Sequence, residues 1–221
     1  MATKGTQHDI RVRALADEAL RVCLSALYVE LPFLDTVLFR LRFEADSSGT
    51  VRTWTTTAQV ALYNPRHVLE TYRESSARLA HELLHLALHF VFCHMFVDAA
   101  VDRELWGTAC DVAVETLIDS LGLPDAADGR ESERGAYAAL LFDAPRAITA
   151  ERVYRALADG SLSETDLYLL GEACYVDEHL WYGGAHRYAK DGEQSDRQAD
   201  AEQRESGESE QGLDTVEQTM T

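Results

Sequence analysis

Four histidines fall within fourteen positions of one strongly apolar stretch, and their spacing is typical of metal ligands. The segment AHELLHLALHFVFCHMF contains His81-Glu-Leu-Leu-His85, an HExxH motif. On a helix, positions i and i+4 differ by about 40°, so both imidazoles share one face and can hold one Zn²⁺. Glu82 would then be the general base that takes a proton from a metal-bound water attacking a peptide bond. The motif predicts zinc-dependent peptidase chemistry.

A second frame of the same helix has the same geometry. His85 and His89 are also four positions apart, but the residue after His85 is Leu86, so this pair would bind a metal without a general base. The spacing leaves both pairs open, and we prefer His81 with His85 because that frame keeps the glutamate. His94 lies about 180° around the helix from His85, so we expect it to pack near the site rather than bind the ion.

A catalytic zinc needs a third protein ligand, and the next predicted helix offers two carboxylates at i and i+4. Asp111 and Glu115 lie in the run Ala-Cys-Asp-Val-Ala-Val-Glu, which is too apolar for solvated acids. We expect Asp111 to be the third ligand, with Glu115 either the alternative ligand or a partner of a ligand histidine. Further along, His179 follows Asp177 and precedes Trp181, and it is a candidate for steadying a substrate oxyanion.

The elements that must position these residues are mainly helical. Apolar periodicity predicts helices at 9–29, about 74–96, about 102–121, 150–157 and 164–172. Thr149 and Ser163 are the expected N-caps of the last two. Strands are expected at 36–44, 51–54 and 59–63, and a polar loop at 125–135. His67 and His186 are expected at the surface. This order predicts an α+β fold: a mainly helical domain with a small antiparallel β-sheet near the N-terminus.

The chain has 221 residues, with 38 acidic and 20 basic side chains and a net charge of −18. This acidity argues against binding to nucleic acids or to anionic lipids. Residues 190–221 carry ten acidic and three basic side chains and no aromatic one, so we expect a disordered acidic tail after a domain at 1–189. Four scattered cysteines and an N-terminus without an apolar signal segment indicate a cytoplasmic protein.

These motifs resemble the bacterial metallopeptidase-like domain usually found ahead of a von Willebrand factor A-like (VWA-like) domain. Three stretches carry the resemblance: the histidine helix at 81–97, the segment from Val101 to Glu115, and Asp177-Glu-His-Leu-Trp181. The resemblance implies a zincin-like domain acting on peptides or proteins and encoded beside MoxR-type AAA ATPases. The 221 residues do not include a VWA-like domain. The alternative function is therefore a catalytically inactive metal-binding adaptor that works with such an ATPase.

Overall fold

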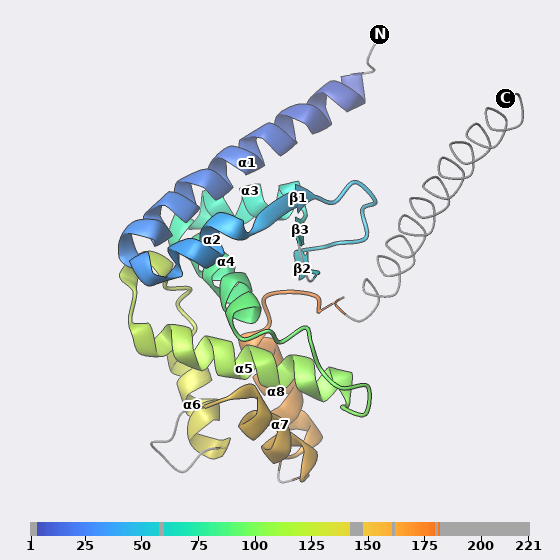
Figure 1. Ribbon diagram of the computed structural model, residues 1–221, viewed down its shortest axis with the longest axis vertical. Coiled ribbons are helices and arrows are strands. Elements are labelled where there is room, and N and C mark those ends of the chain that lie inside the picture. The colour runs from blue at the N-terminus through green and yellow to red at the C-terminus, as the bar shows by residue number, and fades with distance from the viewer. Residues whose placement is uncertain (1–3, 58–59, 142–147, 161, 180, 182–221) are drawn as a thin grey trace, which may run out of the picture. The chain divides into compact units, whose positions relative to one another are not determined.

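The computed structural model describes residues 4–57, 60–141, 148–160, 162–179 and 181. The chain divides into two units, Met1–Trp181 and Tyr182–Thr221. The second unit, and with it His186 and the predicted tail at 190–221, lies outside the described residues. The first unit is mostly helical and has a three-stranded sheet near its N-terminus (Figure 1). The predicted mainly helical α+β class is confirmed.

The elements follow one another in a simple order. The helical segments are α1 (Lys4–Glu30), η1 (Pro32–Leu34), α2 (Asp35–Arg40), α3 (Pro65–Glu74), α4 (Ser76–Val91), α5 (Arg103–Leu121), η2 (Pro124–Ala126), α6 (Glu131–Leu141), α7 (Ala150–Ala158) and α8 (Glu164–Cys174). The strands are β1 (Arg42–Ala45), β2 (Trp54–Thr56) and β3 (Val60–Tyr63). The predicted N-caps are confirmed, because the Thr149 and Ser163 side chains accept hydrogen bonds from backbone N–H groups of α7 and α8.

The sheet has the strand order β1-β3-β2 and is mixed rather than antiparallel. β3 pairs antiparallel with β2 but parallel with β1. After β1, the carboxylate of Asp46 accepts hydrogen bonds from the N–H groups of Ser48 and Val51, which makes a loop instead of a tight hairpin. The chain can therefore place β2 on the far side of β3. The expected strand at 36–44 is wrong over most of its length, since α2 occupies its first residues and buries Leu38.

Helix α4 lies at the centre of the molecule, between α1 and α5 (Figure 1). Every residue from Leu79 to His89 is buried. One apolar core joins α4 to α1, α2, α3 and the sheet, and a second joins α5 to α7 and α8. Because α4 is enclosed on all sides, its histidines and Glu82 must find polar partners inside the protein.

Two helix boundaries differ from the predicted ones. The expected helix at 74–96 is divided at Ser75, whose side chain caps α4, and it ends at Val91. Cys93 then adopts φ +56°, and the backbone N–H of His94 donates to the carbonyl of His89 at 3.1 Å. Helix α4 is therefore followed by a residue in the left-handed region and by a hydrogen bond back to its last turn. The expected loop at 125–135 is also wrong in its second half, where α6 begins at Glu131.

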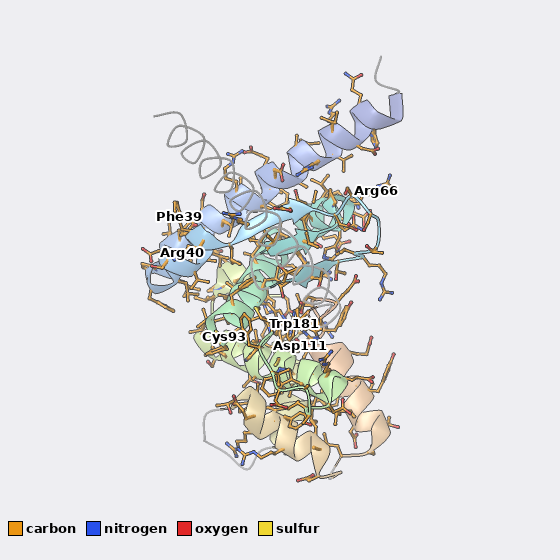
Figure 2. All side chains as sticks on the ribbon, turned by 45° about the vertical axis from the view of Figure 1, so that its right-hand side comes forward. Phe39, Arg40, Arg66, Cys93, Asp111 and Trp181 are labelled. Atoms are coloured by element: carbon orange, nitrogen blue, oxygen red, sulfur yellow. The ribbon has the colours of Figure 1, made fainter. Side chains whose placement is uncertain are left out.

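No single described helix is long and apolar enough to cross a membrane. The bent pair Gln7–Glu30 and Pro32–Arg40 has sufficient length and apolar composition only when its two parts are taken together. That pair exposes large apolar side chains, including Phe39, which lies on the outside of the molecule (Figure 2). The four cysteines are all free thiols.

Candidate metal centre

Three histidines of α4 face two carboxylates of α5. His81, His85 and His89 are four positions apart and form one stripe along the helix. The Nε2 atom of His81 lies 2.9 Å from Oε2 of Glu115, and Nδ1 of His85 lies 2.6 Å from Oε1 of the same carboxylate. Nε2 of His89 lies 3.3 Å from Oδ1 of Asp111. The earlier histidines of α4 contact the later carboxylate of α5, Glu115, and the last histidine, His89, lies by the earlier one, Asp111. The two helices therefore run antiparallel here.

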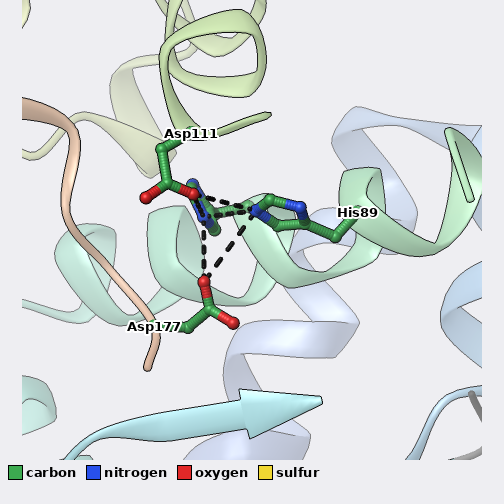
Figure 3. Close-up of side chains that lie close together, drawn as sticks. His89, Asp111 and Asp177 are labelled. Atoms are coloured by element: carbon green, nitrogen blue, oxygen red, sulfur yellow. Dashed lines mark hydrogen bonds and ion pairs between the residues drawn. The ribbon is translucent and has the colours of Figure 1, made fainter. Parts of the chain in front are cut away.

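His85 and His89 direct their Nε2 atoms toward each other and toward two aspartates. The two Nε2 atoms are 2.8 Å apart, and Oδ1 of Asp111 lies 3.4 Å and 3.3 Å from them. Oδ1 of Asp177, from the segment after α8, lies 3.6 Å and 3.9 Å from the same atoms. Figure 3 shows His89 between the two carboxylates. We call these four residues the His–Asp cluster; their donor atoms all lie within 4.8 Å of one another.

Several buried polar atoms of the cluster and of the adjacent His179 have no hydrogen-bond partner among the described residues. Oδ1 of Asp111, both carboxylate oxygens of Asp177 and Nε2 of His179 are buried and make no hydrogen bond within the described part of the chain. Nε2 of His179 nevertheless lies only 2.8 Å and 2.9 Å from the two carboxylates. Buried anionic oxygens that converge without hydrogen bonds are costly unless a cation neutralises them. Two imidazoles and two carboxylates are suitable donors for a metal ion, so the residues present fit one.

Histidines supply the positive charge at this point. Burial opposes ionisation of Asp111 and Asp177, but the charge of His179 holds the pKa of each carboxyl below its usual range. The two carboxylates in turn raise the pKa of His179 to about 10, although burial works in the opposite direction. Within the described ranges, the ion pairs of the two aspartates are with histidines alone. A bound cation would replace this histidine charge.

The outer nitrogens of the two cluster histidines are also held in place. Nδ1 of His85 lies 2.6 Å from Oε1 of Glu115, and Nδ1 of His89 lies 3.0 Å from Nδ1 of His94. Burial, with the nearby His89, lowers the pKa of His94 to about 3, so His94 is neutral and its Nδ1 can accept a hydrogen bond from His89. The indole N–H of Trp106 donates to the carbonyl of His94 at 2.9 Å and fixes its position. Both Nε2 atoms are thereby left facing the aspartates.

The opposite end of the histidine stripe is neutralised by an arginine. Arg134 of α6 forms ion pairs with Glu115 at 3.0 Å, Asp119 at 2.5 Å and Asp128 at 2.7 Å. His81, Glu115 and Asp128 have donor atoms close enough for a metal. The guanidinium of Arg134 already supplies a permanent cation there, however, whereas the ion pairs of the cluster aspartates among the described residues are with histidines, whose charge a metal ion can replace. The electrostatics therefore favour the His–Asp cluster as the metal position.

Glu82, the expected general base, belongs to a different network. Its Oε2 accepts a hydrogen bond from the indole N–H of Trp54 at 2.8 Å and lies 2.9 Å from Nε2 of His67. Its Oε1 lies 3.8 Å from Arg78. His67, expected at the surface, is partly buried by this arrangement. Because adjacent helix positions differ by about 100°, Glu82 faces the sheet while the histidine stripe faces α5.

The structure brings together His85, His89 and Asp111, which the sequence singles out, and adds Asp177. The preferred pair His81 and His85 shares Glu115 rather than Asp111. Glu115 therefore contacts His85 at Nδ1, the nitrogen that faces away from the aspartates, as expected for a partner of a ligand histidine. The sequence marks Asp177 only as a neighbour of His179, because a ligand on a loop has no periodic spacing that would identify it.

Residues 17–217 match the family described as "Putative metallopeptidase domain", which is most of the chain. The chain belongs to this metallopeptidase family. No curated protein and no solved structure matches it. Membership of the metallopeptidase family agrees with the metal-binding chemistry of the His–Asp cluster and confirms the resemblance at the level of the family.

Proposed function

We propose that the chain is a zinc-binding module of the metallopeptidase family, with the ion held by His85, His89, Asp111 and Asp177. One observation carries this proposal: these donors converge from α4, α5 and the segment after α8, are buried, and include carboxylate oxygens without hydrogen bonds. Imidazole and carboxylate together are typical zinc ligands, whereas calcium and magnesium prefer oxygen alone. Bound zinc would act as a Lewis acid or as a structural cross-link.

The same centre favours metal binding without peptide hydrolysis. The residue after His85 is Leu86, so the pair facing Asp111 has no adjacent glutamate. A catalytic zinc keeps one position open for water, yet the cluster offers four donors, and His179 lies beside them. Relative exposure is 0% for His85, His89 and Asp177, which leaves little access for a peptide. These features support the adaptor alternative.

A zinc peptidase is the second candidate. Family membership implies peptide or protein substrates, and neither oxygen of Asp177 makes a hydrogen bond to another described residue. If Asp177 left the metal, its carboxylate could take a proton from a metal-bound water in place of Glu82, with His179 beside it. Partnership with a MoxR-type AAA ATPase and a VWA-like domain is a prediction that rests on the resemblance of the motifs.

Elemental analysis of the natively purified chain tests the metal site. We expect about one zinc per chain, as for a single site of this donor type. Asp111→Asn and Asp177→Asn should lose the ion, and Glu82→Gln should keep it because Glu82 lies outside the cluster. A metal-free wild-type chain would overturn the proposal. So would a chain that keeps zinc after His89→Ala and loses it after His81→Ala.

Peptidase activity is tested separately, with an unfolded protein such as casein and the zinc-loaded chain. We expect no cleavage above the level of an Asp111→Asn control. Cleavage that Glu82→Gln abolishes would establish the HExxH mechanism. Cleavage that survives in Glu82→Gln but is lost in an Asp177→Asn variant shown to retain zinc would establish the second candidate.

A further inference from the structure

The segment that brings Asp177 to the cluster is fastened to the sheet by the next residue. Oε1 of Glu178 accepts hydrogen bonds from the backbone N–H groups of Arg52 at 2.5 Å and Thr53 at 2.9 Å. The N–H of Glu178 donates to the carbonyl of Trp54 at 2.8 Å. The Arg52 side chain is 84% exposed and its guanidinium lies 3.8 Å from Glu178, so this surface ion pair contributes little. The three backbone bonds attach the segment to the start of β2.

The imidazole of His179 is seated on Gly107 of α5. A Cβ atom added at Gly107 would lie 2.7 Å from Nδ1 of His179, so a side chain there would displace the ring. The rings of Trp181 and His89 contact the same imidazole at centroid distances of 4.4 Å and 5.5 Å. His179 has φ +39°, which is unfavourable for a residue with a side chain and persists only where the surroundings enforce it.

We propose that Glu178 and Gly107 are positioning residues of the metal centre. Glu178 fixes the segment on the sheet side, and Gly107 admits the ring of His179 on the α5 side. Asp177 directly precedes these two attached residues, and its carboxylate is therefore held against His85 and His89. A loop aspartate without them would lose conformational entropy each time it met the ion. The inference rests on the proposed metal site, and neither positioning residue donates an atom to the ion.

Substitution of Glu178 in the full chain tests the first attachment. Glu178→Ala should weaken zinc binding by about 10- to 100-fold, the usual effect of losing a residue that orients a ligand. Glu178→Gln keeps an oxygen that accepts both N–H bonds and should recover most of the affinity. Glu172→Ala, at an exposed glutamate of α8, is the matched control and should bind like wild type. Competition with a chromophoric chelator gives the affinities.

Substitution of Gly107 tests the second attachment. Gly107→Ala should weaken zinc binding and change the visible absorption of the Co²⁺-loaded chain, which reports the ligands directly. Gly171→Ala is the control, because a Cβ atom at Gly171 would meet only the Thr108 methyl at 3.9 Å, an ordinary contact. Thermal unfolding of each metal-free variant checks the fold. If Glu178→Ala does not fold, Gly107→Ala decides the result.

The outcomes separate this inference from the proposed function. Wild-type affinity and a wild-type Co²⁺ spectrum in Gly107→Ala, with wild-type affinity in any folded Glu178→Ala, would overturn the positioning role while leaving the zinc site in place. Equal losses in Glu172→Ala or Gly171→Ala would also overturn it, because the effect would then be a general one. A wild-type chain that binds no zinc would overturn the proposed function itself.

Discussion

Glu115 lies 2.6 Å from Nδ1 of His85 and so determines which nitrogen of that imidazole faces the aspartates. Burial alone would raise the pKa of Glu115, but hydrogen bonds from His81 and His85 lower it to about 2. Glu115 is therefore an anion at neutral pH and accepts the Nδ1–H of His85. This fixes the tautomer whose Nε2 is available to a metal.

Glu115→Gln should weaken zinc binding by about 10- to 100-fold, because an amide orients His85 less strongly than a carboxylate does. The four donors of the His–Asp cluster are unchanged, so the variant should still bind one ion at saturating zinc. Chelator competition measures the affinity. Glu133→Gln, at an exposed glutamate of α6, is the control. Wild-type affinity in Glu115→Gln would show that the orientation of His85 does not depend on this anion.

Glu115 should also contribute to acid sensitivity of the metal-free chain. Its pKa in the folded protein, about 2, is below the ordinary value of 4.5, so its ionised form stabilises the fold. That stabilisation is fully present above pH 4.5 and is lost as the pH falls toward 2. Urea unfolding at several pH values should show a shallower decline in the free energy of unfolding for Glu115→Gln than for wild type. Equal slopes would contradict this assignment.

Zinc binding should release protons at pH 7. Burial disfavours the charged form of His85, but the carboxylates of Asp111, Asp177 and Glu115 raise its pKa well above the ordinary value, so His85 holds a proton without metal. Coordination through Nε2 requires a neutral ring, so about one proton or more should leave on binding and the affinity should rise with pH. Calorimetry in buffers of different ionisation enthalpy measures this number. A value of zero would mean that His85 is not a ligand.

Arg134→Met should destabilise the fold without changing the number of ions bound. The Arg134 side chain is 3% exposed and neutralises Glu115, Asp119 and Asp128, so its loss leaves buried carboxylates without a cation. Breaking a buried ion pair from one side costs about 3–5 kcal/mol. Urea unfolding measures the loss, and Arg130→Met, at a more exposed arginine, is the control. A cost below about 1 kcal/mol would show that the network is solvated.

The sequence predicts the long helices well because their signals are local. Apolar periodicity and capping residues lie inside each helix, and α5, α7 and α8 begin close to the predicted positions. Helices α2 and α6 differ from the sequence expectation for physical reasons. The run Val37-Leu38-Phe39 is apolar in a way that suits either a strand or a helix. The stretch at 131–135 is polar because the buried residue of α6 at that point is Arg134, and no apolar periodicity reveals it.

The metal ligands are harder to predict from the sequence than the helices are. The spacing on α4 identifies the histidine stripe, but His81, His85 and His89 are equally spaced, so spacing cannot select a pair. The selection depends on Asp111, Asp177 and Arg134, which come from three other parts of the chain. The HExxH motif directs attention to Glu82, whereas the tertiary contacts place that carboxylate against Trp54 and His67.

The order of the cluster residues along the chain has a consequence for biosynthesis. α4 and α5 emerge from the ribosome well before Asp177, which comes after α8. A growing chain therefore presents two histidines and one aspartate with the last donor still missing. At the proposed site, we expect the ion to be retained only once residue 177 and the strands that anchor its segment are both in place. If the proposed site is correct, metal content should distinguish completed molecules from a chain interrupted after α7, which should fail to keep zinc.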